Sequence, residues 1–158
     1  MHAAKRSIES SLEEGATLSG DLLCLCDSGE VDCFYSGGVD GRIHVWSHDL
    51  TVKDPLYSIG AHHGRINAMK YSYAMCLLIS AGNDGTIQCR GVSNGQKLQI
   101  IPDAQTTLFD LNGMTKRVTA LVLLQDSSTH IYFVANTVNG ELAFFEVVIY
   151  DDTVARYH

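Results

Sequence analysis

The sequence has little proline, a low share of charge and no long apolar run, and each shortage excludes a class of protein. Only 2 prolines stand against 14 glycines in 158 residues, so the turns depend on glycine. The longest apolar stretch, 142–150, is interrupted by Glu146 and falls short of the roughly 20 residues that a membrane helix requires. Charged residues make up 18% and apolar residues 46%, a balance that excludes general disorder.

Basic residues are scarce, because 11 lysines and arginines stand against 18 acidic residues and leave a formal net charge of −7. Proteins bind nucleic acids and anionic membrane surfaces through clustered positive charge. The basic residues here are scattered, with adjacent pairs only at 5–6 and 116–117. We therefore expect no nucleic-acid partner and no membrane partner. The acidic balance fits either a basic partner surface or plain solubility.

The five cysteines are an odd number at spacings unlike a disulfide framework, which indicates free thiols in a reducing compartment. Residues 1–20 carry three glutamates where a secretory leader needs an apolar core, so an intracellular location, cytoplasmic or nuclear, is expected. Cys24, Cys26 and Cys33, with His44 nearby, are candidate zinc ligands, but their spacing is not typical of zinc sites. We expect these cysteines to pack in the core, and we predict no metal and no cofactor.

A turn signal recurs along the chain. Residues 36–46 read SGGVDGRIHVW, and 44 positions later residues 80–90 read SAGNDGTIQCR. Asp-Gly between apolar runs predicts a hairpin, because both central residues of the favoured turn need positive φ. Asn139-Gly140 gives a third such turn, 55 residues after the second, so the pattern indicates a repeat architecture.

Short strands separated by turns follow from residue 22 onward and fall into three cycles of four. The expected strands are 22–26, 31–36, 42–46 and 55–59, then 65–71, 76–80, 86–90 and 97–101, then 117–124, 131–135, 141–148 and a last strand from 147 to 150 or beyond. Sheets of four short strands at this period fit the blades of a propeller, which bury both faces against neighbours.

The same pattern predicts how the chain is divided. We expect three units over 18–60, 61–101 and 117–150, with an insertion at 102–116 and a tail at 151–158. The first 17 residues are expected to form an arm or a short helix over 3–14, because Ile8 and Leu12 share one side of a helix there.

Residues 18–150 resemble the WD-repeat β-propeller family. In that family a histidine before the first strand, a serine or threonine in the second, an aspartate in the tight turn and a tryptophan in the third form one hydrogen-bonded set. The resemblance implies structural roles for Ser36, Asp40 and Trp46 in the first unit and for His62, Ser80 and Asp84 in the second. The sequence departs from the pattern at Leu18, Arg90 and Ala135, and the third unit keeps only Asn139 and the aromatic Phe145.

The fold that the resemblance implies is all-β, a partial β-propeller arc of about three four-stranded antiparallel blades. A closed propeller needs about four to eight blades, so an arc of three leaves two exposed flanks. We therefore expect a fragment or short form of a larger propeller, in which the remaining blades or another chain complete the ring.

The function that the resemblance implies is a non-catalytic scaffold that binds other proteins. In the family, the tight turns and the connections between units line a common partner-binding surface, here Val39, Asn83, Val138, His63 and Arg65. Arg65 is the strongest candidate, because a guanidinium recognises carboxylates and phosphates through a planar fork. The alternative is that Arg65 is only an exposed residue at the start of a strand.

Two other functions stay open. The chain could be a truncated remnant without specific binding. It could also be an enzyme on a propeller scaffold, which would need acid, base or metal-binding residues clustered at the central channel. His62, His63 and Asp84 could suggest acid–base chemistry, but no nucleophile or second carboxylate shares a motif with them. We predict no enzymatic activity.

Overall fold

The computed structural model describes residues 22–29, 33–49, 51–92 and 97–148. Within these ranges eleven strands form three antiparallel sheets, and no helix occurs. None of the described segments is a helix with the length and hydropathy to cross a membrane. The helix predicted over 3–14, Leu18 and the tail at 151–158 lie outside the described residues.

Each sheet is a meander whose strands pair in chain order. Sheet 1 contains β1 (Leu22–Asp27), β2 (Cys33–Gly38), β3 (Arg42–Ser47) and β4 (Tyr57–Gly60). Sheet 2 contains β5 (Ile66–Ser72), β6 (Leu77–Gly82), β7 (Thr86–Gly91) and β8 (Gln99–Thr107). Sheet 3 contains β9 (Val118–Asp126), β10 (His130–Thr137) and β11 (Leu142–Val148). The predicted all-β chain of successive antiparallel meanders is confirmed.

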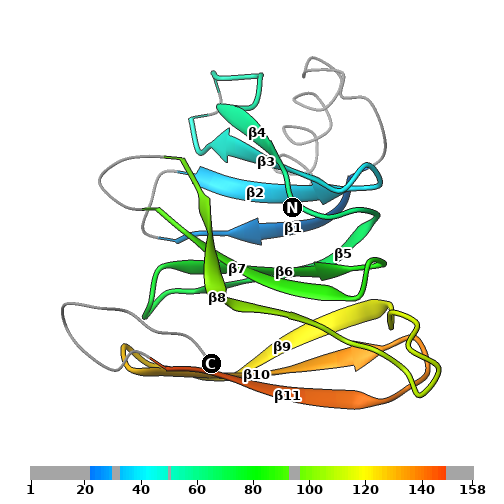
Figure 1. Cartoon of the computed structure of the whole chain (residues 1–158). Coiled ribbons are helices and arrows are strands. Elements are labelled where there is room, and N and C mark those ends of the chain that lie inside the picture. Colours follow the sequence, from blue (N-terminus) through cyan, green and yellow to red (C-terminus); the bar gives the residue numbers. More distant parts are fainter. Residues whose placement is uncertain (1–21, 30–32, 50, 93–96, 149–158) are drawn as a thin grey trace, which may run out of the picture.

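The three sheets lie face to face with sheet 2 in the middle (Figure 1). One core fills the space between sheets 1 and 2, where Tyr35, Ile43 and Val45 meet Ile66 and Leu78. A second core lies between sheets 2 and 3 and contains the residues Ile79, Ile87, Cys89, Leu121, Ile131, Phe133 and Val147. Because side chains alternate across a strand, β6 supplies Leu78 to one core and Ile79 to the other. Sheet 2 is therefore buried on both faces.

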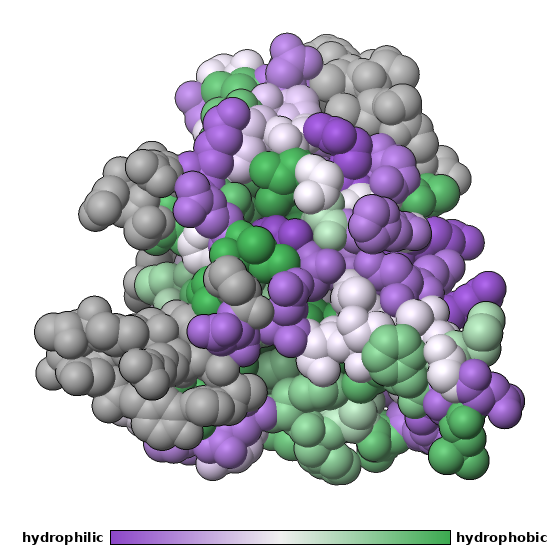
Figure 2. Space-filling view, in the orientation of Figure 1, coloured by the Kyte–Doolittle hydropathy of each residue, from purple (hydrophilic) through white to green (hydrophobic). Residues whose placement is uncertain are grey.

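In the part of the chain that the structure describes, sheets 1 and 3 each pack against another sheet on one face only, although Ser36 and His44 on the other face of sheet 1 are buried. On the outer face of sheet 3 the exposed apolar residues are Val122, Leu124, Tyr132, Leu142 and Phe144, the last with 70% of its surface accessible. Figure 2 shows hydrophobic residues along the lower edge of the molecule, where sheet 3 lies. On sheet 1, Leu23 and Leu25 are exposed. These are the two exposed flanks that an arc of three blades predicts.

The last strand of sheet 2 differs from the prediction. Instead of a strand over 97–101 and an insertion at 102–116, β8 continues to Thr107. Its pairing with β7 shifts between Gln88 and Arg90, so residues 101–104 bulge out of register. An outer strand tolerates Pro102 and its missing N–H at such a bulge, which is why the proline does not end the strand. Only 108–116 forms a loop, closed by a bridge between Phe109 and Thr115.

Sheet 3 has three strands within the described residues. Of the fourth strand predicted from 147 to 150 or beyond, Val147 and Val148 belong to β11, and the rest lies outside the described residues. Elsewhere the predicted bounds are close to the observed ones. The largest shift at a strand start is two residues, as in β4, which begins at Tyr57 instead of Pro55.

Candidate interaction face

The turns predicted as a contact surface lie together at one end of the three sheets. The β2–β3, β6–β7 and β10–β11 turns and the β4–β5 and β8–β9 connections all emerge at the right-hand end in Figure 1. We call this end the turn face. An antiparallel meander brings every second connection to the same end, so this clustering follows from the strand order. Figure 2 shows hydrophilic residues over much of the turn face beside sheets 1 and 2.

The three tight turns share one backbone conformation. Gly41, Gly85 and Gly140 have φ of 76°, 75° and 78°, and each glycine N–H donates to the carbonyl three residues earlier over 2.9 to 3.3 Å. Among the described residues other than glycine, only Cys76 has positive φ. The turns are therefore type I turns followed by a left-handed glycine, whereas the sequence predicted two residues with positive φ.

His62, Ser80 and Asp84 meet in sheet 2, as the family resemblance predicts. Nδ1 of His62 lies 3.0 Å from Oδ1 of Asp84, and Nε2 lies 2.8 Å from Oγ of Ser80. The backbone N–H groups of His63 and Thr86 also donate to the Asp84 carboxylate, each over 3.1 Å. These bonds join the β4–β5 connection to the β6–β7 turn and hold the two loops of the turn face together.

The charge states in this set follow from burial. Burial holds the pKa of His62 below its usual value, although the nearby Asp84 pulls it upward. The imidazole is neutral near pH 7, so Nδ1–H donates to Asp84 while Nε2 accepts from the Ser80 hydroxyl. Burial also opposes ionisation of Asp84, but attraction to His62 and hydrogen bonds from Thr86 outweigh it and lower the pKa of Asp84.

The order serine, histidine, aspartate matches the hydrogen bonding of a hydrolase triad. Ser80, however, has 0% of its surface exposed, and His62 has only 7%. A substrate carbonyl cannot approach a nucleophile that has no accessible surface. We call this buried set of hydrogen bonds the strut of sheet 2.

Arg90 occupies the tryptophan position of sheet 2. Its Nη1 donates to Oγ of Ser80 over 3.4 Å, and only 5% of the residue is exposed. No described carboxylate lies within ion-pair distance of the guanidinium, whose pKa is lowered by burial. Nε2 of Gln88 donates to Oγ1 of Thr86, but Oε1 of Gln88 has no partner among the described residues. Sheet 2 thus holds a buried charge and a buried carbonyl that are only partly compensated.

Sequence reasoning missed the contributions of Thr86, Gln88 and Arg90. The signal that could have found them is alternation, because residues two apart on one strand share a face. Ser80 on β6 stands opposite Gln88 on β7. Thr86, Gln88 and Arg90 therefore face the same side of sheet 2 as Ser80.

Sheet 1 contains a smaller version of this set. Nε1 of Trp46 donates to Oγ of Ser36 over 2.8 Å, as the resemblance predicts. Asp40 does not take part in this pair. It is exposed, and within the described residues its carboxylate accepts a hydrogen bond only from the backbone N–H of Arg42; the histidine position of this unit, Leu18, lies outside those residues. Nδ1 of His44 lies 2.5 Å from Oγ of Ser58, a contact between β3 and β4 that the sequence did not indicate.

The five predicted contact residues all lie on the turn face. Val39 and Val138 are 38% and 58% exposed, and the side chains of His63 and Arg65 are also exposed. Asn83 is half-buried, because its Oδ1 accepts from Nδ2 of Asn67 over 2.8 Å. The same Nδ2 of Asn67 also donates to the carbonyl of Val118, so Asn83 helps to join sheet 2 to sheet 3.

The candidate zinc ligands are not brought together. Sγ of Cys24 points to sheet 2, 3.7 Å from the carbonyl oxygen of Ile66, whereas His44 faces the other side of sheet 1. Cys33 is buried, and burial raises the pKa of Cys24 and of Cys26 to about 11. The described residues contain no group of three histidines, cysteines or carboxylates that could hold a metal ion.

Comparison with known proteins agrees with this architecture. The β-propeller domain of Cps50 (Swd1) from Myceliophteria thermophila superimposes with a TM-score of 0.62 at 18% identity, covering 89% of this chain and 40% of that one. The class of protein is therefore a β-propeller, and the three sheets are its blades.

The repeat type follows from the sequence matches. The family described as WD domain, G-beta repeat matches residues 12–47 and 53–89. Human apoptotic protease-activating factor 1 is 30% identical over 87 residues, which are 55% of this chain and 6% of that protein. These two stretches identify WD repeats in the chain, in agreement with its similarity to a solved β-propeller. It spans well under half the length of both relatives.

Proposed function

We propose that this chain is a non-catalytic module that binds another protein through its turn face. WD-repeat propellers are typically protein-interaction scaffolds. The observation that carries the proposal is an exposed arginine on a rigid backbone. The Arg65 carbonyl accepts from the N–H of Asn83 over 2.9 Å, and a Cβ added at Gly82 would stand 1.9 Å from that carbonyl oxygen.

The Arg65 side chain is available for a partner. It is exposed, and no described residue forms a hydrogen bond or an ion pair with its guanidinium. Because the backbone is already fixed, only the side chain has to be ordered when the guanidinium binds a carboxylate or phosphate. Val39 and Val138 supply exposed apolar contacts on the same face, and His63 supplies a polar one. This combination fits a protein partner with an acidic group near an apolar patch.

A pull-down with two variants tests this proposal. Arg65→Glu reverses the charge on the turn face, and Lys97→Glu reverses an exposed charge on the β7–β8 connection at the opposite end. We expect Arg65→Glu to reduce capture of a specific partner by at least about tenfold, with the fold intact by circular dichroism, whereas Lys97→Glu has no effect. Equal capture by both variants would refute the proposed surface.

We also propose that further blades or another chain complete the ring. Two observations support this: the outer faces of sheets 1 and 3 expose apolar residues, and the chain covers only 40% of the solved propeller. Light scattering on the isolated chain tests it. Self-association, or binding of ANS to exposed apolar surface, supports the proposal. A stable monomer that binds no ANS and unfolds sharply contradicts it.

The proposed module is intracellular, in the cytoplasm or the nucleus. Its support is the cysteine chemistry, because all five cysteines are free thiols in the structure. An oxidising compartment would leave the exposed Cys76 open to intermolecular disulfides. Fractionation of cells that express the chain tests this directly.

A further inference from the structure

Sheet 3 ends on a strand edge that no described strand covers. In the other two sheets the third strand is followed by an outer strand, because β3 pairs with β4 and β7 pairs with β8. β11 pairs with β10 from Leu142 to Val148, and no described strand pairs with its other side. In an antiparallel ladder the N–H and C=O groups of every second residue point to the far edge. Among the described residues, the backbone donors and acceptors on this edge of β11 have no strand partner.

A groove of about 230 Å³ lies between this region of sheet 3 and β8. Phe133, Phe145 and Val147 form its wall on sheet 3, and Asp103 and Ala104 line it on β8. The rings of Phe133 and Phe145 are stacked with their centroids 5.2 Å apart. The groove is mainly apolar and has room for one aliphatic side chain beside the aromatic pair.

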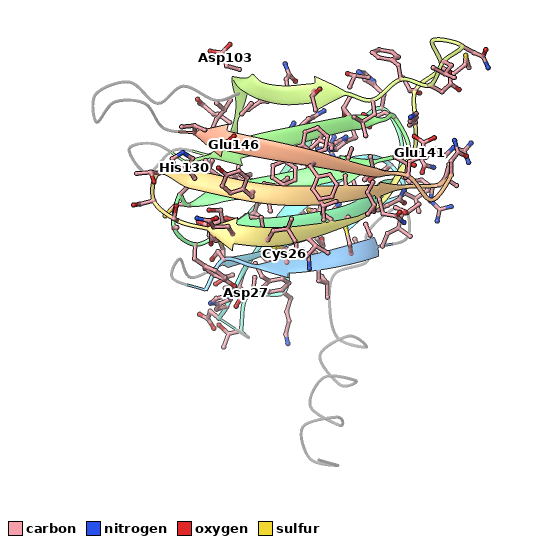
Figure 3. All side chains as sticks on the ribbon, turned by 90° about the horizontal axis from the view of Figure 1, so that it is seen from below. Cys26, Asp27, Asp103, His130, Glu141 and Glu146 are labelled. Carbon is pink, nitrogen blue, oxygen red and sulfur yellow. The ribbon has the colours of Figure 1, made fainter. Side chains whose placement is uncertain are left out.

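The lining of this groove contains one acidic residue, Asp103, which is exposed. Figure 3 shows Glu146 toward the same end of the molecule as Asp103, but Glu146 is on the outer face of β11, where it accepts a hydrogen bond from Tyr132. None of the residues that line the groove is a lysine or an arginine. Glu141 lies at the far end of β11 in Figure 3, where it is paired with Lys116. Asp103 is therefore an exposed carboxylate in the lining of the groove, and it favours a basic group in whatever fills the groove.

The fourth strands of sheets 1 and 2, β4 and β8, show what a fourth strand would contribute to sheet 3. On β4, Tyr57 and Ile59 pack against the core, while Ser58 between them contacts His44 on the opposite face. On β8, Ala104 is buried against sheet 3. An outer strand thus supplies backbone hydrogen bonds along its length and one side chain in two to the neighbouring sheet.

We propose that the β11 edge and this groove form a second binding site, which takes an extended peptide segment of a partner as an added fourth strand. Backbone hydrogen bonds to β11 supply affinity, as in other cases of strand addition. One aliphatic side chain enters the groove beside Phe145, and a lysine or arginine two residues away faces Asp103. This site is distinct from the turn face, so its occupancy does not depend on Arg65.

The test uses the full chain and a capped heptapeptide of sequence TVTKTVK as the probe. Its valines and the central lysine fall on one side of an extended strand, and its threonines fall on the other. Two control peptides carry N-methyl groups on alternate amides, one on the odd and one on the even positions. Because an added strand uses only every second amide, one methylated peptide should lose binding and the other should keep it.

Protein variants provide the second arm of the test. Asp103→Lys reverses the charge at the groove, and Asp54→Lys reverses an exposed charge on the β3–β4 connection as a matched control. By titration calorimetry we expect Asp103→Lys to weaken probe binding at least about tenfold and Asp54→Lys to leave it unchanged. In the wild-type protein, amide exchange of alternate residues of β11 should slow at least about tenfold when the peptide binds.

Three results would overturn the proposal. In the first, both methylated peptides bind as well as the parent peptide. That result would show that the backbone edge of β11 does not contribute to binding. In the second, Asp103→Lys has no effect. In the third, alternate β11 amides are already protected in the free protein, because the chain's own residues or a second copy then occupy the edge. Dependence of that protection on protein concentration identifies the second copy.

Discussion

Sheets 2 and 3 have the same meander order but are stabilised in different ways. Sheet 2 lies between two cores, and the whole of β6 is buried. Sheet 3 packs against sheet 2 on one face, and its other face exposes Val122 and Phe144. The difference shows that a blade's stability depends on its neighbours more than on its own strands. Sheet 2 is therefore the rigid middle that supports the turn face, whereas sheet 3 has an exposed outer face that is available for binding.

The largest expected effect comes from truncating a side chain in sheet 2. Ile79→Ala should lower the free energy of unfolding by about 3 to 4 kcal/mol, because Ile79 is fully buried and its removal leaves a cavity. Val122→Ala in sheet 3 should cost less than about 0.5 kcal/mol, because Val122 is half exposed. Urea unfolding of both variants measures the difference. Equal losses would show that the outer face of sheet 3 is covered in solution.

The strut in sheet 2 should give the next largest effect. His62→Ala should lower the free energy of unfolding by about 2 to 3 kcal/mol, because it leaves the hydroxyl of Ser80 and the carboxylate of Asp84 without their shared partner. Ser36→Ala in sheet 1 removes one acceptor for Trp46 and should cost about 1 kcal/mol. Thermal unfolding checks the order. A smaller loss for His62→Ala than for Ser36→Ala would contradict the account.

The lowered pKa of His62 also predicts how the free energy of unfolding changes with pH. Its folded-state pKa lies below the ordinary value of 6.5, because burial disfavours the imidazolium. The contribution of His62 to the free energy of unfolding is complete above the pKa that His62 has in the unfolded chain. As the pH falls below about 6.5, the unfolded chain takes up the proton first, so stability decreases by at most about 1.4 kcal/mol per pH unit until the folded pKa is reached.

Urea unfolding at several values between pH 7.5 and pH 5 measures this decrease. Asp84 does not contribute in this range, because its pKa lies below 3.8. The pKa of His44 is also lowered by burial, so His44 changes stability in the same direction. His62→Asn should therefore flatten the profile in part, and an unchanged profile would mean that His62 is not the titrating group.

The smallest expected effect concerns the residue that stands in for tryptophan. Arg90→Trp should raise the free energy of unfolding by about 0.5 to 1 kcal/mol, because it replaces a buried guanidinium that has no carboxylate partner. Trp46 in sheet 1 shows the geometry, since its indole reaches Ser36 at 2.8 Å, against 3.4 Å for Arg90 and Ser80. Differential scanning calorimetry tests the sign. A loss of stability would mean that Arg90 has a partner that compensates its charge.

The sequence predicted the features that depend on local pattern. Alternation and Asp-Gly or Asn-Gly turns located the strands. The joining of His62, Ser80 and Asp84 came from the family resemblance, because hydrogen bonding between distant strands leaves no periodic signal.

The features that were missed depend on pairing between strands. The bulge that carries β8 past Pro102 is set by its register with β7, and a proline in isolation predicts the end of a strand. The contact between His44 and Ser58 needs the β3–β4 register to bring the two residues opposite each other. Asp40 has only a local hydrogen bond among the described residues, to the N–H of Arg42, which its own turn sequence does not distinguish from the arrangement of Asp84.

Amide hydrogen exchange of the free chain, resolved by residue, tests the central contrast most directly. The account predicts the slowest exchange in β6, at Leu78 and Ile79, where opening requires global unfolding. It predicts that alternate amides of β11 exchange at least about a hundredfold faster, because no described strand protects that edge. Exchange in β11 as slow as in β6 would contradict it, because sheet 3 would then be covered and stabilised like the middle of the arc.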